Sequence, residues 1–332
     1  MWFKKLTGFT EESPTQVRAN ITITGNQLSS KINGKTYTFG RLEIPNLKEL
    51  RSRSSLISPS FKGRLVLSEL VADVSELHKK GANSGCLVQA ASQFNLLEMV
   101  APSVSPEAGV DIYERDFTQG PACAIAAGAG TIYRNYFASV NDQVGQTLDN
   151  QIDCLHDMGT ALGNVDNRLW VMRNGYALAS ENGLVAISNR LQTITEAELD
   201  ALRETLRIGL QWDTQVTLAS STHTLTQAYC SALPVAYTFH PDHLWAPFAQ
   251  LVLEASYEAT LHAALLNFAK TGNNQVYLTL LGGGAFGNNL TWILAAMRRA
   301  LGLFQRVPLE VAIVSYRRSI PPVADLVEEF NA

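Results

Sequence analysis

Near the end of the chain, a run rich in glycine and asparagine separates an apolar segment of strand length from an apolar segment of helical length. The run is LGGGAFGNN, from Leu281 to Asn289, between QVYLTLL and LTWILAAMRRALGLF. Glycine lets a backbone approach an anion closely and adopt positive φ, and the free N–H groups at a helix N-terminus attract phosphate. This strand, turn and helix therefore predict a diphosphate site, with a tight turn that binds nothing as the alternative.

The elements around this run alternate between helix and strand. From Thr195 the hydrophobic periodicity predicts a helix (EAELDALRETLRIGL), a strand (TQAYCSALPVAY), a helix from Pro247 to Lys270, a strand (QVYLTLL), a helix from Leu290 to Leu303 and a strand (LEVAIVSY). Such alternation is typical of a mostly parallel α/β sheet. We expect one elaborated domain, because no internal repeat or linker interrupts the chain.

The first half of the chain carries further signals. Turn pairs at Gly25-Asn26 and Asn33-Gly34 predict a β-hairpin or meander over residues 20–42, and Asn174-Gly175 predicts a second hairpin in mid-chain. The remaining expectations are a helix in RLVLSELVADVSELHKK, a strand in CLVQAAS, a helix that starts at Pro121, and a strand in ENGLVAIS.

Composition excludes several classes of function. The chain of 332 residues has a net charge of −4 and no dense basic run, so nucleic acid is not expected as a partner. No apolar stretch reaches the roughly 20 residues that span a bilayer, and the first residues lack a signal-peptide core. A soluble, cytoplasmic protein is expected, although an exported effector gives the same pattern. The four cysteines show no metal-ligand spacing, which predicts buried free thiols, no metal and no cofactor.

Two familiar phosphate motifs do not fit the glycine run. Gly282, Gly284 and Gly287 satisfy GxGxxG, but a dinucleotide-binding domain opens with this motif and needs further βα units after it. Only one helix, one strand and a short tail follow here. A Walker A loop is excluded because no GK[ST] follows the glycines. An NADP-dependent oxidoreductase therefore remains only as a weak alternative.

The closing βαβ passage, from QVYLTLL through the glycine run to LEVAIVSY, resembles the C-terminal part of macrodomains, most closely their poly(ADP-ribose) glycohydrolase-like branch. In that family a final loop of the form GxGxFGN wraps the diphosphate of ADP-ribose. CLVQAASQFNLLEMV is similar to the family's VNxAN strand. The resemblance covers roughly residues 65–316 and implies a three-layer α/β/α mixed sheet, with residues 1–62 as an N-terminal β-hairpin extension and 63–332 as the ADP-ribose-binding domain.

The resemblance implies a set of ligand-binding residues. From the glycine run these are Gly282, Gly283, Gly284, Ala285, Phe286, Gly287 and Asn288, and from the VNxAN-like strand they are Gln93, Phe94 and Asn95. Independently of the resemblance, Thr118, Gln119 and Gly120 start the small-residue helix and offer a second helix N-terminus for the ligand, with a capped helix start as the alternative. The sequence departs from the glycohydrolases at two points. No GGG follows Asn95, and Thr118-Gln119-Gly120-Pro121 stands where the family has a Gln-Glu-Glu triplet.

Cleavage of a glycosidic bond needs a carboxyl group that protonates the leaving group or activates water. Because groups at the C-terminal ends of strands face the ligand crevice, Glu98, Asp116 and Asp242 are the candidate catalytic acids, each with a solvated loop carboxylate as the alternative. His240 and His243 flank Asp242, but Pro241 makes this a turn and favours a helix N-cap over a metal site.

Three functional hypotheses follow. The first is a hydrolase that removes or cleaves ADP-ribose, with ADP-ribose or an ADP-ribosylated protein as the partner. The second is a non-catalytic reader of ADP-ribosylation, which the missing triplet favours. The third is the NADP-dependent oxidoreductase.

Overall fold

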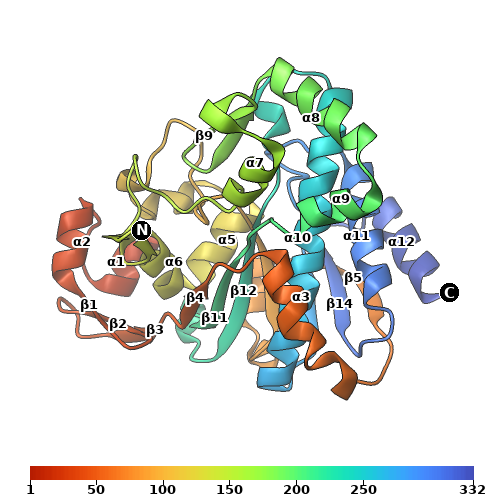
Figure 1. Ribbon diagram of the computed structural model, residues 1–332. Helices are drawn as coiled ribbons and strands as arrows, with labels where there is room; N and C mark the ends of the chain where they lie inside the picture. Colours follow the sequence, from red (N-terminus) through yellow and green to blue (C-terminus); the bar gives the residue numbers. More distant parts are fainter.

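The computed structural model describes residues 1–58 and 60–332, and one seven-stranded mixed sheet forms its centre (Figure 1). In spatial order the strands are β4 (Arg41–Glu43), β11 (Gly209–Gln215), β12 (Thr224–Ser231), β6 (Leu87–Ser92), β13 (Gln275–Leu278), β14 (Glu310–Ser315) and β5 (Val66–Val71). The strands from β12 to β5 are parallel, whereas β11 is antiparallel to both neighbours. The predicted mostly parallel, mixed α/β sheet is confirmed.

Helices cover both faces of this sheet, as predicted for a three-layer α/β/α arrangement (Figure 1). On one face, Thr226 of β12 hydrogen-bonds Asn267 in the long helix α10 (Asp242–Thr271). On the other face, the neighbouring Gln227 bonds His78 of α4 (Val74–Lys79). The layer around α10 contains α3 (Leu47–Ser55), α8 (Glu181–Thr193), α9 (Glu196–Arg203) and α11 (Leu290–Leu303); α4 lies with α5 (Gln119–Ala126) and α6 (Gly128–Tyr136).

The N-terminal segment forms a small lobe against the α5–α6 layer. It consists of α1 (Trp2–Thr7), α2 (Pro14–Asn20) and a three-stranded antiparallel meander, β1 (Ile21–Thr24), β2 (Gln27–Ser30) and β3 (Thr36–Thr38), which confirms the predicted hairpin or meander. Its apolar side chains, such as Phe3 and Leu28, share a core with Leu97 and Tyr113. β4 and α3 instead belong to the central sheet and the α10 layer. The boundary at residue 62 stays a prediction.

The predicted helix in RLVLSELVADVSELHKK is wrong for its first half. Residues Val66–Val71 form β5, and only Val74–Lys79 are helical. Leu65 and Leu67 are buried while Val66 is exposed, which is the alternation of a strand. Because a short strand and a short helix follow each other closely, their apolar residues together imitate helical spacing.

Two further segments differ from expectation. ENGLVAIS is the start of α8 and not a strand, because Ser180 caps the helix through the N–H of Gly183 and Leu184 and Ile187 face the core. β11 was not predicted as a strand. The mid-chain hairpin at Asn174 is confirmed as β9 (Trp170–Arg173) paired with β10 (Tyr176–Ala179).

Several shorter elements complete the chain. The small-residue helix begins at Gln119, with Pro121 in its first turn, close to the predicted start. The other short elements are the η4 turn (Asp111–Arg115), β7 (Ser139–Val140), β8 (Gln143–Val144), α7 (His156–Leu162), the η7 turn (Val235–Tyr237) and α12 (Pro321–Asn331). All four cysteines are buried free thiols, as predicted. Within the described residues, no helix is both long and apolar enough to cross a bilayer.

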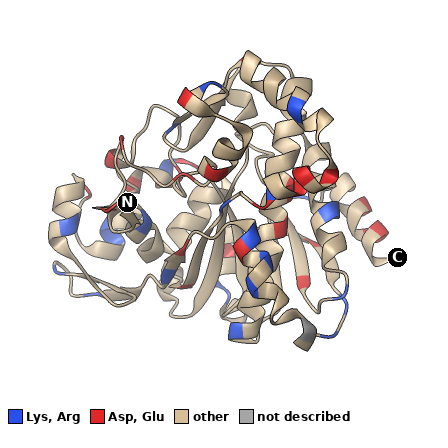
Figure 2. Cartoon of the chain, in the orientation of Figure 1, with Lys and Arg blue, Asp and Glu red and all other residues tan. Residues whose placement is uncertain are grey.

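A charged cluster joins four helices of the α10 layer. Glu258 of α10 is 2% exposed and accepts hydrogen bonds from Arg51 of α3 (2.6 Å) and Arg299 of α11 (2.5 Å). Asp200 of α9 pairs with the same two arginines, and Figure 2 shows acidic and basic residues next to one another on these helices. Burial alone would raise the pKa of Glu258, but hydrogen bonds from His262, Arg51 and Arg299 outweigh it and hold the pKa well below its usual range.

We expect Glu258→Gln to lower the free energy of unfolding at pH 7 by about 3 kcal/mol, because it leaves two arginines without their buried counter-charge. Since folding lowers the pKa of Glu258, this contribution is present above the carboxyl's unfolded pKa and is lost as the pH falls through the acid range. Urea unfolding of the variant and of Glu329→Gln, whose pair with Arg298 is exposed, measures the difference. An equal, small effect of both substitutions would contradict a structural role for the cluster.

Candidate functional site

The site lies where two parallel strands at the centre of the sheet separate. β6 and β13 pair only through Leu87 and Val88, so the C-terminal half of β6 has no strand on that side. Side chains satisfy its backbone instead: the Gln119 amide donates to the carbonyl of Gln89 and accepts from the N–H of Ala91, both at 2.8 Å. A crevice therefore opens between the ends of β6 and β13, the position where open α/β sheets bind ligands.

The glycine run after β13 borders one side of this crevice and is fixed by hydrogen bonds to other parts of the fold. The Tyr257 hydroxyl of α10 donates to the carbonyl of Thr279 and accepts from the N–H of Leu281. The Asn288 amide donates to the carbonyl of Leu233, and the backbone N–H of Ala236 donates to Phe286. The loop is thereby fixed to α10 and to the turn after β12, while Gly283, Gly284 and Ala285 remain exposed.

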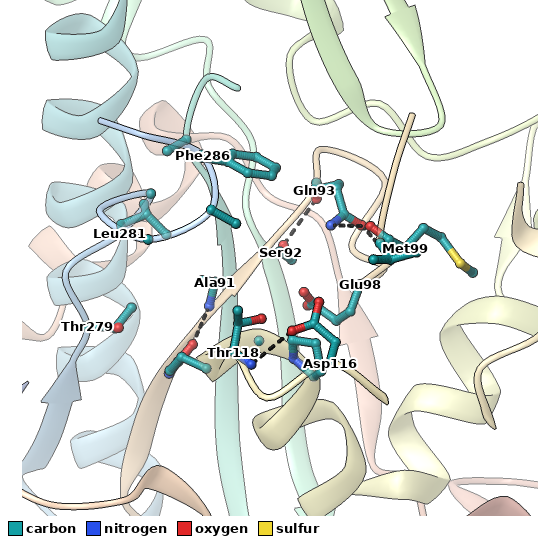
Figure 3. Close-up of a pocket in the computed structure, with 18 of the residues that line it drawn as sticks. Ala91, Ser92, Gln93, Glu98, Met99, Asp116, Thr118, Thr279, Leu281 and Phe286 are labelled. Carbon is teal, nitrogen blue, oxygen red and sulfur yellow. Dashed lines mark hydrogen bonds between the residues drawn. The ribbon is translucent and has the colours of Figure 1, made fainter. Parts of the chain in front are cut away.

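Three aromatic rings form a wall beside the loop. Phe286 lies 5.2 Å from Tyr176 of β10 and 5.7 Å from Tyr237 of the η7 turn, and the two tyrosine rings are 5.0 Å apart, measured between ring centroids. Figure 3 shows the Phe286 ring beside the cavity, across from Glu98. The wall joins three segments that are far apart in the sequence, and it supplies an apolar surface for a ring or sugar.

Glu98 lies on the opposite side, in the turn that follows β6. Its side chain is buried, and in the described part of the chain no hydrogen-bond partner contacts its Oε1 atom. Burial raises the pKa of Glu98 well above its usual range, the positive charge of Arg134 lowers it in part, and the negative charge of Asp116 raises it further. Glu98 is therefore a carboxyl that holds its proton to an unusually high pH, in contact with a cavity.

Asp116 faces Glu98 from the segment between η4 and α5. Both residues line the same cavity (Figure 3), and Asp116 accepts a hydrogen bond from the N–H of Thr118 at 2.9 Å. Asp116 is half-buried and keeps contact with water. A buried acid next to a more exposed one is an arrangement that lets two carboxyl groups perform different tasks.

Two adjacent cavities share the ridge formed by Thr118, Gln119, Thr279, Leu280 and Gly284. The first, of about 130 Å³, contains the two acids, Gln93, Ser92, the aromatic wall and the glycine loop. The second, of about 540 Å³, is more apolar and is lined by Val74, Ile293 and Ile320 with the exposed rings of Phe117 and Tyr316. The loop therefore separates a small acidic compartment from a larger apolar one.

Most of the predicted site residues gather here. Those that line the first cavity are Gln93, Glu98, Asp116, Thr118, Gln119, Gly120, Gly282, Gly284, Ala285 and Phe286. Gly283 and Asn288 line the second cavity. Gly287 lines neither; its φ of 70° turns the loop against Ala236.

Three predicted residues lie elsewhere. Phe94 is 1% exposed and packs in the main core, so its ring does not reach the cavity. Asn95 is fully buried; its amide donates to Gln151 and its oxygen accepts from the N–H of Leu97, which fixes the turn. Asp242 is the exposed first residue of α10, lines neither cavity, and is preceded by Pro241 at the N-cap position.

Sequence reasoning missed Ser92, Tyr176 and Tyr237 as lining residues. Tyr176 follows the predicted Asn174-Gly175 turn, but only the folded chain places that hairpin over the turn after β6, where the Tyr176 hydroxyl donates to the carbonyl of Met99. Among the described residues, no group of three or more His, Cys, Asp or Glu side chains could bind a metal ion.

Comparisons with known proteins found matches among solved structures alone. No protein-family model matches the chain, and no curated protein matches it. Among solved structures, poly(ADP-ribose) glycohydrolase from Deinococcus radiodurans in complex with ADP-ribose is 8% identical with a TM-score of 0.46, covering 87% of this chain and 93% of that one. The glycohydrolase from Thermomonospora curvata bound to the inhibitor ADP-HPD is 10% identical with a TM-score of 0.44, covering 96% of both chains.

Within the loop, Gly282 and Gly284 make different demands on the fold. Gly282 has a φ of 73°, and a Cβ there would lie 2.4 Å from the side chain of Ala232, whereas a Cβ at Gly284 would meet nothing within 4 Å. We expect Gly282→Ala to lower the free energy of unfolding by about 1 to 3 kcal/mol and Gly284→Ala to leave it within about 0.5 kcal/mol. Thermal and urea unfolding of the matched pair measure this; equal effects would show that the loop does not have the described conformation.

Proposed function

We propose that this protein binds ADP-ribose, or ADP-ribose attached to a protein, across the glycine loop and hydrolyses the glycosidic bond at its distal ribose. The carrying observation is the buried carboxyl of Glu98, which lines the cavity beside the loop and whose Oε1 atom has no hydrogen-bond partner among the described residues. Burial raises the pKa of such a group, which favours the protonated form that can donate to a leaving group. A non-catalytic reader of ADP-ribose is the alternative within the same ligand class.

The loop supports a diphosphate at the ridge between the two cavities. Its exposed glycines let the two phosphates lie close to the backbone, and α11 begins directly after it with Asn289 as N-cap. A ligand centred there extends in two directions. Its ribose end enters the acidic compartment, and its base enters the apolar compartment beside Phe117 and Tyr316.

Gly120 supports Glu98 as the acid. Thr118-Gln119-Gly120-Pro121 lies near the place where the resemblance implies a Gln-Glu-Glu triplet, and it contains no glutamate. A Cβ added at Gly120 would lie 2.3 Å from Oε2 of Glu98. The absent side chain on α5 therefore leaves the space that the Glu98 carboxyl occupies, so a carboxyl group is present at this helix start although it comes from the turn after β6.

Asp116 is proposed as the second carboxyl. Its partial exposure lets it contact a water molecule on the cavity side, and its negative charge favours the protonated form of Glu98. In this scheme Glu98 protonates the leaving group, and Asp116 orients or activates the attacking water. The third hypothesis, an NADP-dependent oxidoreductase, gains no support from this cavity, because none of the described residues that line either compartment is basic.

We expect Glu98→Gln to reduce the rate of ADP-ribose release by about 10²- to 10⁴-fold while ADP-ribose still binds. The wild-type rate falls as the pH rises through the raised pKa of Glu98, because the acid must carry its proton. Release is measured with proteins ADP-ribosylated on arginine, serine or glutamate and with poly(ADP-ribose), and binding is measured by calorimetry.

Glu11→Gln is the matched control, since Glu11 is another carboxyl whose pKa burial raises, but it bonds Tyr136 and lines neither cavity. Loss of release in Asp116→Asn or Asp242→Asn with normal release in Glu98→Gln would assign the acid elsewhere. ADP-ribose binding without turnover of any substrate by the wild type would favour the reader.

The binding part is tested separately by Gly284→Glu, which places a carboxylate at the exposed centre of the loop. Like-charge repulsion of the diphosphate should weaken ADP-ribose binding at least about tenfold. Calorimetric titrations with ADP-ribose, AMP and NADP, with Gly284→Ala as the steric control, measure the effect. The proposal fails if ADP-ribose binds no better than AMP, or if NADP binds best.

A further inference from the structure

Arg134 of α6 is a fully buried cation without a carboxylate in contact. Its Nε donates to the carbonyl of Leu96 at 3.1 Å, and its other nitrogens donate to Thr131 (3.1 Å) and Gln211 (3.4 Å). The guanidinium lies 3.7 Å from the ring centroid of Tyr229. All of these partners are neutral, and in the described part of the chain no acidic oxygen lies within 4.0 Å of it. A buried charge in this state is costly, so its retention needs a reason.

The residue that Arg134 contacts is the strained point of the turn before Glu98. Leu96 has a φ of 64°, an unfavourable conformation for a branched side chain. Its carbonyl accepts from Arg134, while the carbonyl of the preceding Asn95 accepts from the Gln146 amide, which also bonds the carbonyl of Arg134. A strained backbone persists only where its surroundings fix it, and here α6 supplies much of that fixation.

The other end of the turn is closed by side chains that act on the backbone beside Glu98. The Gln93 amide accepts from the N–H of Met99 at 2.8 Å and donates to its carbonyl, and the Tyr113 hydroxyl accepts from the N–H of Glu98 itself at 2.9 Å. These contacts hold the backbone of Glu98 and Met99 and do not involve the Glu98 carboxyl. The position of that carboxyl therefore depends on contacts at both ends of the turn.

We propose that Arg134 is a positioning residue for Glu98: it fixes the Leu96 turn that directs the carboxyl into the cavity, and its buried charge is the positive charge that this carboxyl faces. The inference rests on the proposed role of Glu98 as the acid. The titratable and charged groups that face Glu98 from the surrounding elements are Tyr113, Asp116, Cys123, Arg134, Tyr176 and Tyr229.

In this set Arg134 is the cation. Asp116 is a carboxylic acid, and the remaining groups are weakly acidic tyrosine hydroxyls and one cysteine thiol. Its charge favours the ionised form of Glu98, against burial and Asp116, which favour the protonated form. Removal of the charge moves the titration of Glu98 to higher pH. A purely structural arginine would change stability and leave that titration in place.

The test compares Arg134→Met and Arg134→Gln with Arg134→Lys. The first two variants remove the positive charge, whereas lysine keeps the charge but lacks the planar guanidinium group with its several N–H donors. The protonated carboxyl of Glu98 is followed by infrared difference spectra against the matching Glu98→Gln protein from pH 4 to 10, without substrate. We expect the midpoint to move to higher pH in the Met and Gln variants and to stay near the wild-type value in Lys. Where the Met variant does not fold, the Gln variant, which can still donate to Leu96, answers the same question.

Release of ADP-ribose from the modified proteins is measured in parallel. We expect kcat to fall about tenfold or more in Arg134→Lys with little change in KM, because lysine keeps the charge but lacks the Nε–H that fixes Leu96, so the carboxyl is oriented less well. Arg203→Met is the control: Arg203 is also buried, but it pairs with Glu196 and Glu254 far from the cavity lining, so it should lower stability without moving the Glu98 midpoint. An unchanged midpoint in a folded Met or Gln variant, or full turnover in Arg134→Lys, would overturn the inference. Absence of turnover in the wild type would reject the proposed hydrolase, while the spectra would still decide how Arg134 affects Glu98.

Discussion

The separation of β6 from β13 is the constraint on which the rest of this structure depends. Two parallel strands that pair over only two residues leave backbone donors and acceptors of β6 without a partner, and unpaired buried peptide groups are costly. Gln119 replaces the missing strand on β6, and Gln89 extends from β6 to the N–H of Thr279 and to Thr260 of α10. Polar side chains thus pair the Gln89 carbonyl and the Ala91 N–H of β6 where β13 does not reach them.

The crevice also determines the electrostatics of its acids. Glu98 sits deep enough for burial to favour its neutral form, and Asp116 is close enough to reinforce that preference while remaining partly in water. The buried Arg134 opposes both effects from behind the turn. Because the three contributions have different signs, the protonation of Glu98 depends on a balance between groups on the β6 turn, the η4 segment and α6.

Local chemistry explains which parts could be predicted from sequence. The glycine run after β13, the Asn174 turn and the helix start at Gln119 depend on residues with strong intrinsic preferences, so their type and place were predictable. The β5 segment was not, because its alternation is short and merges with the apolar spacing of α4. The sequence also could not separate Glu98 from Asp242. Both follow a strand, and only the packing of η4, α5 and α6 buries the first and leaves the second exposed.

The same packing explains why Phe94 and Asn95 do not line the cavity although they adjoin residues that do. The N–H of Phe94 donates to the carbonyl of Gly175. A Cβ added at Gly175 would lie 2.5 Å from the side chain of Asn95. The mid-chain hairpin therefore lies directly against this turn, in the space that the side chains of Phe94 and Asn95 would need to reach the cavity. The hairpin brings Tyr176 to the cavity in their place. At α5, Gly120 has no side chain, and the Glu98 carboxyl lies in the space that such a side chain would occupy. Proton transfer depends on where a carboxyl group lies and on its pKa, and not on the element that carries it. A carboxyl group on the β6 turn can therefore lie in this crevice, provided that side chains fix its turn as they fix the turn from Gln93 to Met99 here.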